Sequence, residues 1–491
     1  MTELKEIFNV LEEKINKNDK DLITRAYNFA KKAHEGYKRK SGDPYFVHVF
    51  ETAKNLAKIK MDAQTIAAGF LHDVLEDTET KEEDLKKEFG EEIVSLVNGV
   101  TKLGTLKYTG YERHVESLRK FFIAVVSDLR VVIIKFADRL HNLQTLKYLR
   151  EDKRERIALE SIEIYASLAN RLGMGKFKGD LEDAAFPHLY PKEYAQVEKI
   201  IKGKEKLYKK YLDEAQEELI KELIKNKIKP ITVDYRIKRK YSLWKKLLKY
   251  NMDLDKIYDI IALRIIVENI EDCYKVLGVI HSIWTPLPGR IKDYIALPKT
   301  NGYKSIHTTV FTGSGGILEI QIKTREMHIE ASYGIAAHFG YKEEDYGKNI
   351  NEKNKLKWIE ELKDFQHMPD DSKKFIEHIK MDFFKDRIFI FTPRGDVIDL
   401  PDESNPIDFA YSIHSDLGDH VCGAKINGKM SQIFTKLKNG DIVEILKKKD
   451  AHPSGKWLDY VKTSVAKKNI KLYLTNNSLL SKLKSFAVSK R

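Results

Sequence analysis

Three features that would decide the protein class are missing from this 491-residue sequence. It has only two cysteines, Cys273 and Cys422, far apart and without zinc-site spacing, which argues against a disulfide framework and a cysteine metal site. No apolar run approaches the roughly 18 residues that span a bilayer, and the start reads as an amphipathic helix rather than a signal peptide. Internal repeats and low-complexity tracts are also absent. We therefore expect a cytoplasmic protein of about three packed domains with no membrane partner.

Charge points to anionic partners without identifying them. The 87 lysines and arginines exceed the 74 acidic residues, giving a formal net charge of +13. Such a balance favours nucleotides, RNA or ribosomes as partners, but a lysine-rich composition can equally serve solubility. Both interpretations stay open on composition alone.

Hydrophobic periodicity changes near residue 200. Before Tyr190, apolar residues recur at three- and four-residue spacings, which predicts an all-α half. A charged amphipathic connector follows and ends at Pro230, and then the β-branched run "YDIIALRIIVEN" and the hairpin pattern "TTVFTGSGGILEIQIKT" predict a mixed α/β domain. Residues 341–385 are polar and predicted helical, and residues 386–447 contain a strand-turn-strand unit. The expected fold class is multidomain α and α+β.

The stretch "GFLHDVLEDT" interleaves one histidine and three acids with apolar residues. On a continuous helix the adjacent His72 and Asp73 could both reach one ion at the seam between two faces. His48 in "YFVHVFETA" and Asp138 in "IKFADRLHNLQTL" are the candidates that complete the set. Two imidazoles and two carboxylates suit Mn²⁺, Fe²⁺ or Zn²⁺, and the residues do not choose among them.

The alternative for this stretch is purely structural. In that case His48 and His72 are satisfied core histidines, and the acids pair with Arg139 or Lys135. For any one of these residues the structural explanation is the more common one, but it explains His48, His72, Asp73 and Asp138 together poorly.

A second pair of acids lies in the α/β half. Alternation along "LEIQIKT" places Glu319, Gln321 and Lys323 on one face. Together with Asp259, Glu319 could hold Mg²⁺ on the phosphates of ATP, since Mg²⁺ commonly uses one or two carboxylates plus substrate phosphates. The alternative is an edge strand with a solvated face.

The motifs "RKSGDPYFVH", "LHDVLEDT", "KFADRLHN" and "ANRLGMGKFKGDLED" closely resemble the RelA/SpoT family, over residues 20 to 470. This resemblance implies an alarmone enzyme of the stringent response, both a (p)ppGpp 3′-diphosphatase and a GTP/GDP diphosphokinase that uses ATP. "DYRIKRKYSLWKK" and "GRIKDYIALPKTNGYKSIHTTV" resemble its nucleotidyltransferase-like synthetase domain, and residues 386–447 resemble its small β-grasp TGS domain. The implied order is an all-α HD hydrolase domain (1–195), the synthetase domain (196–340), a helical linker (341–385), TGS (386–447) and a basic helical tail (448–491).

The resemblance also implies roles in hydrolysis of (p)ppGpp. The Mn²⁺ ligands would be His48, His72, Asp73 and Asp138, and the acid pair would be Glu76 and Asp77. Asn142 would hold the nucleotide, and Arg39 and Lys40 would contact phosphates. Gln144 departs from the arginine usual in relatives.

Roles in synthesis follow in the same way. Asp259 and Glu319 match the Mg²⁺ carboxylates, Glu319 also activating the hydroxyl, while Tyr303 matches the residue that stacks on guanine. Arg264 matches an adenine-stacking arginine, although strand parity would place it opposite Asp259. The remaining substrate-binding candidates are Arg236, Lys238, Lys246, Arg290, Lys292, Asn301, His307 and Gln321. Arg290 and Lys292 belong to "RIKD", the basic form that resembles bifunctional members.

Two alternatives remain within this resemblance. "YRIKRKYS" lacks the usual glycine and proline, and Lys304 replaces a common glutamine, so the synthetase could be weak. The chain could instead be a tRNA- or ribosome-binding stress sensor with vestigial sites. His414 matches a position near the tRNA acceptor end, but the distal regulatory domains of long relatives are missing, so we expect only a weak tRNA or ribosome contact.

Overall fold

The computed structural model describes most of the chain, namely residues 2–11, 15–104, 124, 127–299, 301–313, 316–340, 387–438 and 440–475. The chain divides into two compact units, Met1–His367 and Met368–Arg491. Within the described ranges, no helix has both the length and the apolar character needed to cross a membrane. The expected helical linker at 341–385 lies outside the described residues.

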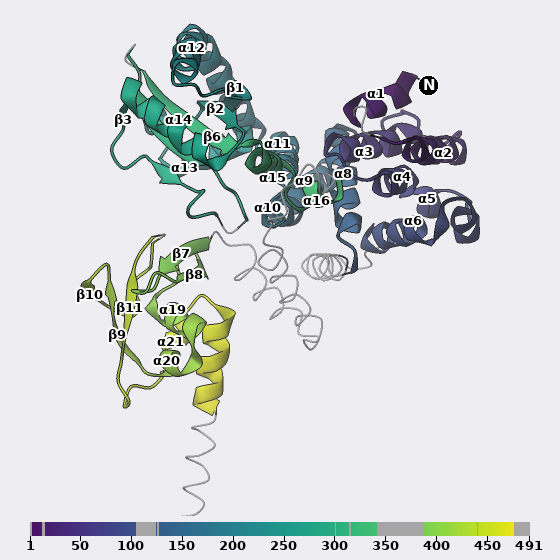
Figure 1. The fold of residues 1–491 in the computed structure, drawn as a ribbon. Helices are drawn as coiled ribbons and strands as arrows, with labels where there is room; N and C mark the ends of the chain where they lie inside the picture. The colour runs from purple at the N-terminus through teal and green to yellow at the C-terminus, as the bar shows by residue number, and fades with distance from the viewer. Residues whose placement is uncertain are drawn as a thin grey trace, which may run out of the picture. The chain divides into compact units, whose positions relative to one another are not determined.

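The first half of the first unit is helical, as the apolar spacing predicts (Figure 1). Asn16, Asp62 and Asp128 begin three of the helices, each accepting a backbone N–H of the first turn through its side chain. Helices α2, α3, α4 and α8 pack on one another around a buried apolar core. The elements are α1 Thr2–Leu11, α2 Lys17–Ala33, α3 Phe46–Lys58, α4 Ala63–Leu71, α5 Val74–Asp77, α6 Glu82–Gly104, α8 Leu129–Gln144, α9 Glu151–Glu160, a π-helical turn Ser161–Ala166, α10 Ser167–Arg171, α11 Gly175–Leu189 and α12 Pro191–Lys225.

The stretch "GFLHDVLEDT" is not the continuous helix that its spacing predicts. α4 ends at Leu71 and α5 begins at Val74, so His72 and Asp73 form a turn between two helices. The turn brings Asp73 Oδ2 to 3.2 Å from His72 Nε2. Neighbouring side chains on an unbroken helix do not face each other. The shared-seam argument from helical geometry is therefore wrong, although the two side chains do converge.

A six-stranded sheet forms the second half of this unit. Its order is β1-β2-β6-β5-β3, with β4 paired to β5. β5 and β6 make the predicted hairpin, and β6 also pairs with β2 in parallel. Because β6 has a neighbour on each side, the alternative of an edge strand with a solvated face is wrong. The strands are β1 Thr232–Ile237, β2 Ile261–Val267, β3 Thr285–Pro286, β4 Lys292–Asp293, β5 Ile306–Phe311 and β6 Ile317–Thr324.

The two faces of this sheet have opposite character. One face carries Leu263, Ile265, Leu318, Ile320 and Ile322, which pack against α12 and against α14 Ile270–Ile283 (Figure 1). The β2–β6 pairing places Arg264, Glu319 and Gln321 together on the other face, because Ala262 lies opposite Glu319 and Arg264 lies opposite Gln321. This polar face holds the candidate residues for synthesis.

The sheet half is joined to the helical half by close backbone contacts. Ile335 N donates to Leu172 O over 3.1 Å. The neighbouring Gly334 has φ +56°, and a Cβ there would lie 2.2 Å from Leu172 O, so only glycine fits. The helices on the sheet side are α13 Lys240–Lys249, α15 Arg325–Tyr333 and α16 Ala337–Gly340.

The second unit is a small mixed domain. β7 Arg387–Phe391 pairs with β8 Val397–Pro401, as predicted, and β9 Val421–Ile426 pairs with both β10 Lys429–Ser431 and β11 Val443–Lys447. Its helices are α19 Pro406–Ile413, α20 Ser415–Asp419 and α21 Trp457–Tyr460, and residues 464–475 are also helical. Trp457, Ala466 and Ile470 pack with Tyr411 and Val421. The segment that follows residue 447 therefore shares a core with the strands before it.

Candidate functional site

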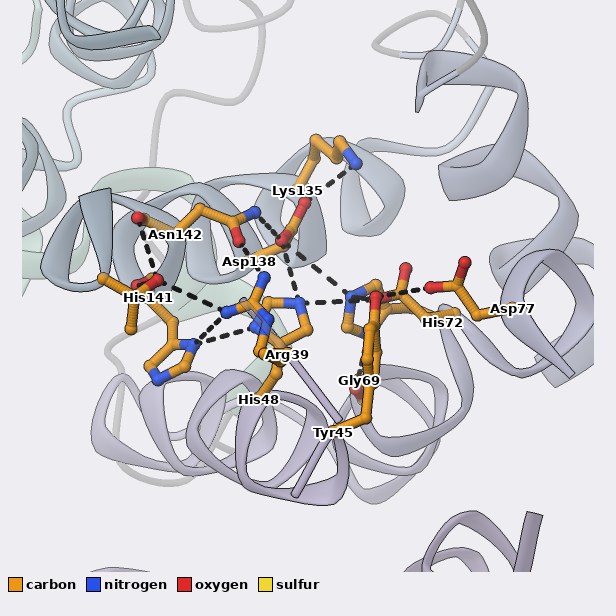
Figure 2. A network of polar contacts seen from close by, with 12 residues as sticks. Arg39, Tyr45, His48, Gly69, His72, Asp77, Lys135, Asp138, His141 and Asn142 are labelled. Atoms are coloured by element: carbon orange, nitrogen blue, oxygen red, sulfur yellow. Dashed lines mark hydrogen bonds and ion pairs between the residues drawn. The ribbon is translucent and has the colours of Figure 1, made fainter. Parts of the chain in front are cut away.

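Four predicted ligands from three separate parts of the chain meet in the helical half, and we call them the His–Asp cluster. They are His48 from α3, His72 and Asp73 from the turn, and Asp138 from α8. His48 Nε2 lies 3.3 Å from Asp73 Oδ2 and 3.2 Å from Asp138 Oδ1, and His72 Nε2 lies 3.2 and 4.0 Å from the same oxygens. Figure 2 shows the imidazoles of His48 and His72 beside the Asp138 carboxylate.

Both imidazoles are oriented by hydrogen bonds on their outer nitrogens. His72 Nδ1 donates to Gly69 O over 2.9 Å, and His48 Nδ1 lies 2.8 Å from His141 Nδ1. Burial, with the nearby His48 and Arg39 charges, lowers the pKa of His141 to about 3, so its neutral ring can accept that bond. Both Nε2 atoms thereby face the cluster. Metal-binding histidines are typically held in this way.

The donor set fits a divalent metal ion. The ligand atoms of His48, His72 and Asp138 lie within 4.8 Å of one another. His72 Nε2 is buried and has no hydrogen-bond partner within the described part of the chain. Burial acts to raise the pKa values of both acids, yet His72 and His48 hold that of Asp73 low, and Lys135 and His48 hold that of Asp138 low. Two carboxylates held in the ionised form and two imidazole nitrogens therefore converge on one point.

The structural alternative is partly right for Asp138. Lys135 Nζ lies 2.8 Å from Asp138 Oδ2, while Asp138 Oδ1 faces the imidazoles. Burial opposes the charge on this lysine, but the Asp138 carboxylate raises its pKa. Arg139 pairs instead with Glu160 at 3.4 Å and with Tyr165. Asp138 Oδ2 is thus paired with Lys135, while Asp138 Oδ1 faces the position where a metal ion would bind.

The predicted acid pair lies on α5, beside the cluster and exposed to solvent. Partial burial and the Asp73 charge raise the pKa of Glu76 above its ordinary value. Asp77 accepts a short hydrogen bond from the hydroxyl of Tyr45, which also lies 2.9 Å from Asp73 Oδ2. Burial and these two carboxylates raise the pKa of Tyr45, so the phenol stays protonated. Sequence reasoning missed this tyrosine.

Two of the three predicted nucleotide contacts join the cluster. Arg39 Nη2 donates to Asn142 Oδ1 over 2.6 Å, and Asn142 Nδ2 donates to Asp138 Oδ1 (Figure 2). Lys40 is exposed, and no hydrogen bond or ion pair to a described residue holds its side chain in the cluster. Gln144 is also exposed.

On the polar face of the sheet, hydrogen bonds connect five of the predicted residues. Arg236 Nη1 donates to Gln321 Oε1 over 2.8 Å, and Gln321 Nε2 donates to Glu319 Oε1 over 2.9 Å. His307 Nδ1 lies 3.4 Å from the same Glu319 oxygen, and its Nε2 lies 2.9 Å from the hydroxyl of Tyr303. We call these five residues and Asp259 the sheet cluster.

Asp259 precedes β2 and lies between two cations. Its oxygens are 2.6 Å from Lys238 Nζ and 2.7 Å from Lys246 Nζ. Burial alone would raise its pKa, but the two lysines lower it to about 2. Burial acts to raise the pKa of Glu319, and the Asp259 charge acts in the same direction, but His307 keeps this pKa below its ordinary value. Both carboxylates are therefore held in the ionised form.

Arg264 does not lie where strand parity places it. Asp259 lies outside β2, so strand alternation does not determine its position relative to Arg264. Within the sheet, Arg264 shares a face with Glu319. Its guanidinium is held by Asp234, with Nε 2.8 Å from Oδ1 and a second short contact from Nη2. The arginine is thus fixed at the rim of the polar face by an ion pair that sequence reasoning did not anticipate.

The remaining predicted residues surround this face without a common network. Arg290 lies 5.5 Å from the ring centre of Tyr258, and the exposed Lys292 pairs through β4 with His307 on β5. Asn301 Nδ2 lies 3.5 Å from Oδ1 of Asn170, in the helical half.

Two lysines near Tyr303 were missed. Lys299 and Lys323 lie 5.1 and 5.3 Å from its ring centre. Lys323 is buried, and burial together with Arg236 and Arg264 lowers its pKa to about 7. Strand alternation places Lys323 on the same face of β6 as Glu319, and this pattern could have identified it. Nothing in the local pattern singled out Lys299.

Three family models match the chain in succession. They are the HD domain over residues 26–175, the region found in RelA/SpoT proteins over residues 235–346 and the TGS domain over residues 388–447. A guanosine-3′,5′-bis(diphosphate) 3′-pyrophosphohydrolase of Aquifex aeolicus is 44% identical over 92% of this chain and 64% of its own length. The chain therefore contains, in this order, an HD domain, a region found in RelA/SpoT proteins and a TGS domain.

Other similar proteins are named for different activities. A GTP pyrophosphokinase of Myxococcus xanthus is 43% identical over 93% of this chain and 60% of its own length. The bifunctional (p)ppGpp synthase/hydrolase SpoT of Escherichia coli K12 is 40% identical over 92% of this chain and 65% of its own length. The chain thus spans less than two thirds of the length of these relatives. The predicted multidomain α and α+β fold class is confirmed.

His414 has a local structural role in the TGS region. It is exposed and begins α20, where its Nδ1 accepts the backbone N–H of Asp416 over 3.2 Å. A histidine that caps a helix needs no RNA partner to explain its position. Contact with tRNA at this residue stays a prediction.

Proposed function

We propose that this chain is bifunctional, hydrolysing (p)ppGpp in its helical half and synthesising it on its sheet. The observation that carries the proposal is the His–Asp cluster, with its orphaned His72 Nε2, next to the acids Glu76 and Asp77. The similar proteins described above are named for hydrolysis, for synthesis or for both. We assign hydrolysis to residues 1–195 and synthesis to residues 196–340.

For hydrolysis, the attacking water oxygen bonds to the phosphorus attached to the ribose 3′ oxygen. The bond from that phosphorus to the 3′ oxygen breaks, and GDP or GTP and pyrophosphate are released. Glu76 and Asp77 are placed to take the proton from water and return one to the leaving oxygen. Asn142 and Arg39, already joined by a hydrogen bond, would orient the nucleotide and its phosphates. A divalent ion held by the His–Asp cluster would supply Lewis acidity and a lower pKa for bound water.

For synthesis, the 3′ hydroxyl of GDP or GTP attacks the β-phosphorus of ATP. The bond from that phosphorus to the α-phosphate breaks and AMP leaves. Glu319 is placed to take the hydroxyl proton, while Arg236, Lys238 and Lys246 would neutralise phosphate charge. A guanine ring would stack on Tyr303. Asp259 and Glu319 would hold Mg²⁺, which would neutralise the charge of the phosphates.

We propose Mn²⁺ for the His–Asp cluster and Mg²⁺ for the sheet cluster. The first set mixes nitrogen and oxygen donors, which suits a first-row transition metal, whereas the second offers carboxylates only. Mn²⁺ and Fe²⁺ can be compared directly by reconstituting the metal-free protein with each ion and measuring hydrolysis.

The test is nucleotide chromatography on two incubations. The first contains ATP, GDP and Mg²⁺, and the second contains ppGpp and Mn²⁺. Formation of ppGpp plus AMP in the first and of GDP plus pyrophosphate in the second supports the proposal. Absence of either product with folded protein would remove the corresponding activity.

A hydrolase with a weak synthetase is the second candidate. It is favoured by one observation, because both oxygens of Asp259 are already ion-paired to Lys238 and Lys246. Binding Mg²⁺ at Asp259 would require at least one of these pairs to open. Slow synthesis beside fast hydrolysis in the same preparation would favour this candidate.

A further inference from the structure

A compact loop presents Tyr45 to the His–Asp cluster. Tyr45 N donates to Tyr37 O and Arg39 N donates to Asp43 O, each over 2.9 Å, so the chain doubles back between α2 and α3. The loop carries Arg39 and Tyr45 inward, while the Tyr37 side chain remains 42% exposed. The sequence pattern gave Tyr45 no role.

The Tyr45 hydroxyl lies between two carboxylates with different tasks. It is 2.9 Å from Asp73 Oδ2 and makes a short hydrogen bond to Asp77 Oδ2. Asp73 Oδ2 is the oxygen that faces His48 and His72. A phenol has one proton and can donate it to only one of these oxygens at a time. When a cation occupies Asp73 Oδ2, the proton is left for Asp77.

The ring that carries this hydroxyl is itself fixed. It stacks on His34 with 5.1 Å between ring centres and 4° between planes, and the Arg39 guanidinium lies 5.6 Å from the ring centre. His34 is buried and held by a contact of 2.9 Å between its Nδ1 and Ala30 O. Holding a catalytic group by a side chain whose own position is locked is how an active site keeps its geometry.

We propose that Tyr45 is a positioning residue that holds the Asp77 carboxylate in place beside Asp73. The inference rests on the proposed hydrolase activity and assigns Tyr45 no direct contact with the reacting atoms. The Tyr45 hydroxyl is therefore expected to affect turnover through Asp77. It should have little effect on the affinity for substrate or metal.

Tyr45→Phe is the test, because it removes the hydroxyl and keeps the ring that stacks on His34. We expect kcat for ppGpp hydrolysis to fall about tenfold or more, the factor that follows from losing one hydrogen bond to a charged group. KM and the Mn²⁺ dissociation constant should change less than about threefold, since all four residues of the His–Asp cluster remain in the variant. The matched control is Tyr37→Phe, an exposed tyrosine of the same loop, which should behave as wild type.

A double variant separates positioning from a general structural effect. If Tyr45 acts through Asp77, then Tyr45→Phe should slow Asp77→Asn no further, because the held group is already gone. A further tenfold loss in the double variant, an unchanged kcat in Tyr45→Phe, or a loss confined to Mn²⁺ affinity would each overturn the proposal.

A crystal structure of Tyr45→Phe gives a readout that does not depend on activity. The Asp77 carboxylate should move away from Asp73 while Asp73, His48 and His72 keep their positions. An Asp77 that stays in place would refute the inference even if turnover fell. A wild-type protein that hydrolyses no ppGpp would instead refute the proposed function, and the position of Asp77 would still decide this inference.

Discussion

Asp138→Asn removes one charge from a buried ion pair while keeping the shape of the side chain. Asp138 is 4% exposed, and Lys135 Nζ lies 2.8 Å from its Oδ2. Breaking a buried pair from one side costs about 3 to 5 kcal/mol, because the remaining charge is left without compensation. The Lys135 side chain is 14% exposed, so we expect the lower end, about 3 kcal/mol, for the metal-free protein.

The second half of this prediction removes the orphaned charge as well. Lys135→Met combined with Asp138→Asn leaves two neutral groups of similar size, and the free energy of unfolding should return to within about 1 kcal/mol of wild type. Both variants should still fail to hydrolyse ppGpp, because the cluster has lost a carboxylate ligand. Urea unfolding in EDTA, followed by circular dichroism, measures the stability, and nucleotide chromatography with Mn²⁺ measures the activity.

Two results would refute this reasoning. If Asp138→Asn were as stable as wild type in EDTA, the pair with Lys135 would contribute nothing. If the double variant bound Mn²⁺ and hydrolysed ppGpp, Asp138 would serve Lys135 alone and would not be a ligand.

Three further outcomes are expected. Asp73→Ala should lower hydrolysis by several orders of magnitude and spare synthesis, while Asp259→Ala should do the reverse; equal loss of both in either variant would contradict separate sites. Mn²⁺ at one hundred times its Kd should stabilise wild type by about 2.7 kcal/mol in thermal melts but leave His72→Ala unchanged. Because the pKa of Asp259 is lowered to about 2, its contribution to stability is present above about pH 4 and lost as pH falls toward 2. Asp259→Asn should remove about 2 kcal/mol of that pH dependence in urea titrations.

Local patterns were enough to predict most of the fold. The helical half, the connector helix, the β5–β6 hairpin and the β7–β8 pair each followed from apolar periodicity within a single stretch. The helix break at His72 and Asp73 did not, because no glycine or proline marks it. The turn instead places two polar side chains toward partners on α3 and α8.

The ligands could be predicted, but the contacts that adjust them could not. His48, His72, Asp73 and Asp138 stood out as polar residues inside apolar helices. Tyr45 reaches acids 28 and 32 residues away, and those contacts depend on how the loop between α2 and α3 doubles back. Periodicity carries no information about such distances. The burial of Lys323 likewise depends on what covers the polar face, which strand alternation alone does not specify.

The two clusters differ in how much of the chain must exist before they can form. Every residue of the His–Asp cluster, with Arg39 and Asn142, lies within the first 142 residues, on or between helices that pack locally. Glu319 reaches its place only when β6 pairs in parallel with β2, which requires the chain through Thr324. Distant parallel pairing is slow, and domains generally fold in N-terminal order during synthesis. On the ribosome, a growing chain would therefore complete the His–Asp cluster before it can assemble the sheet cluster.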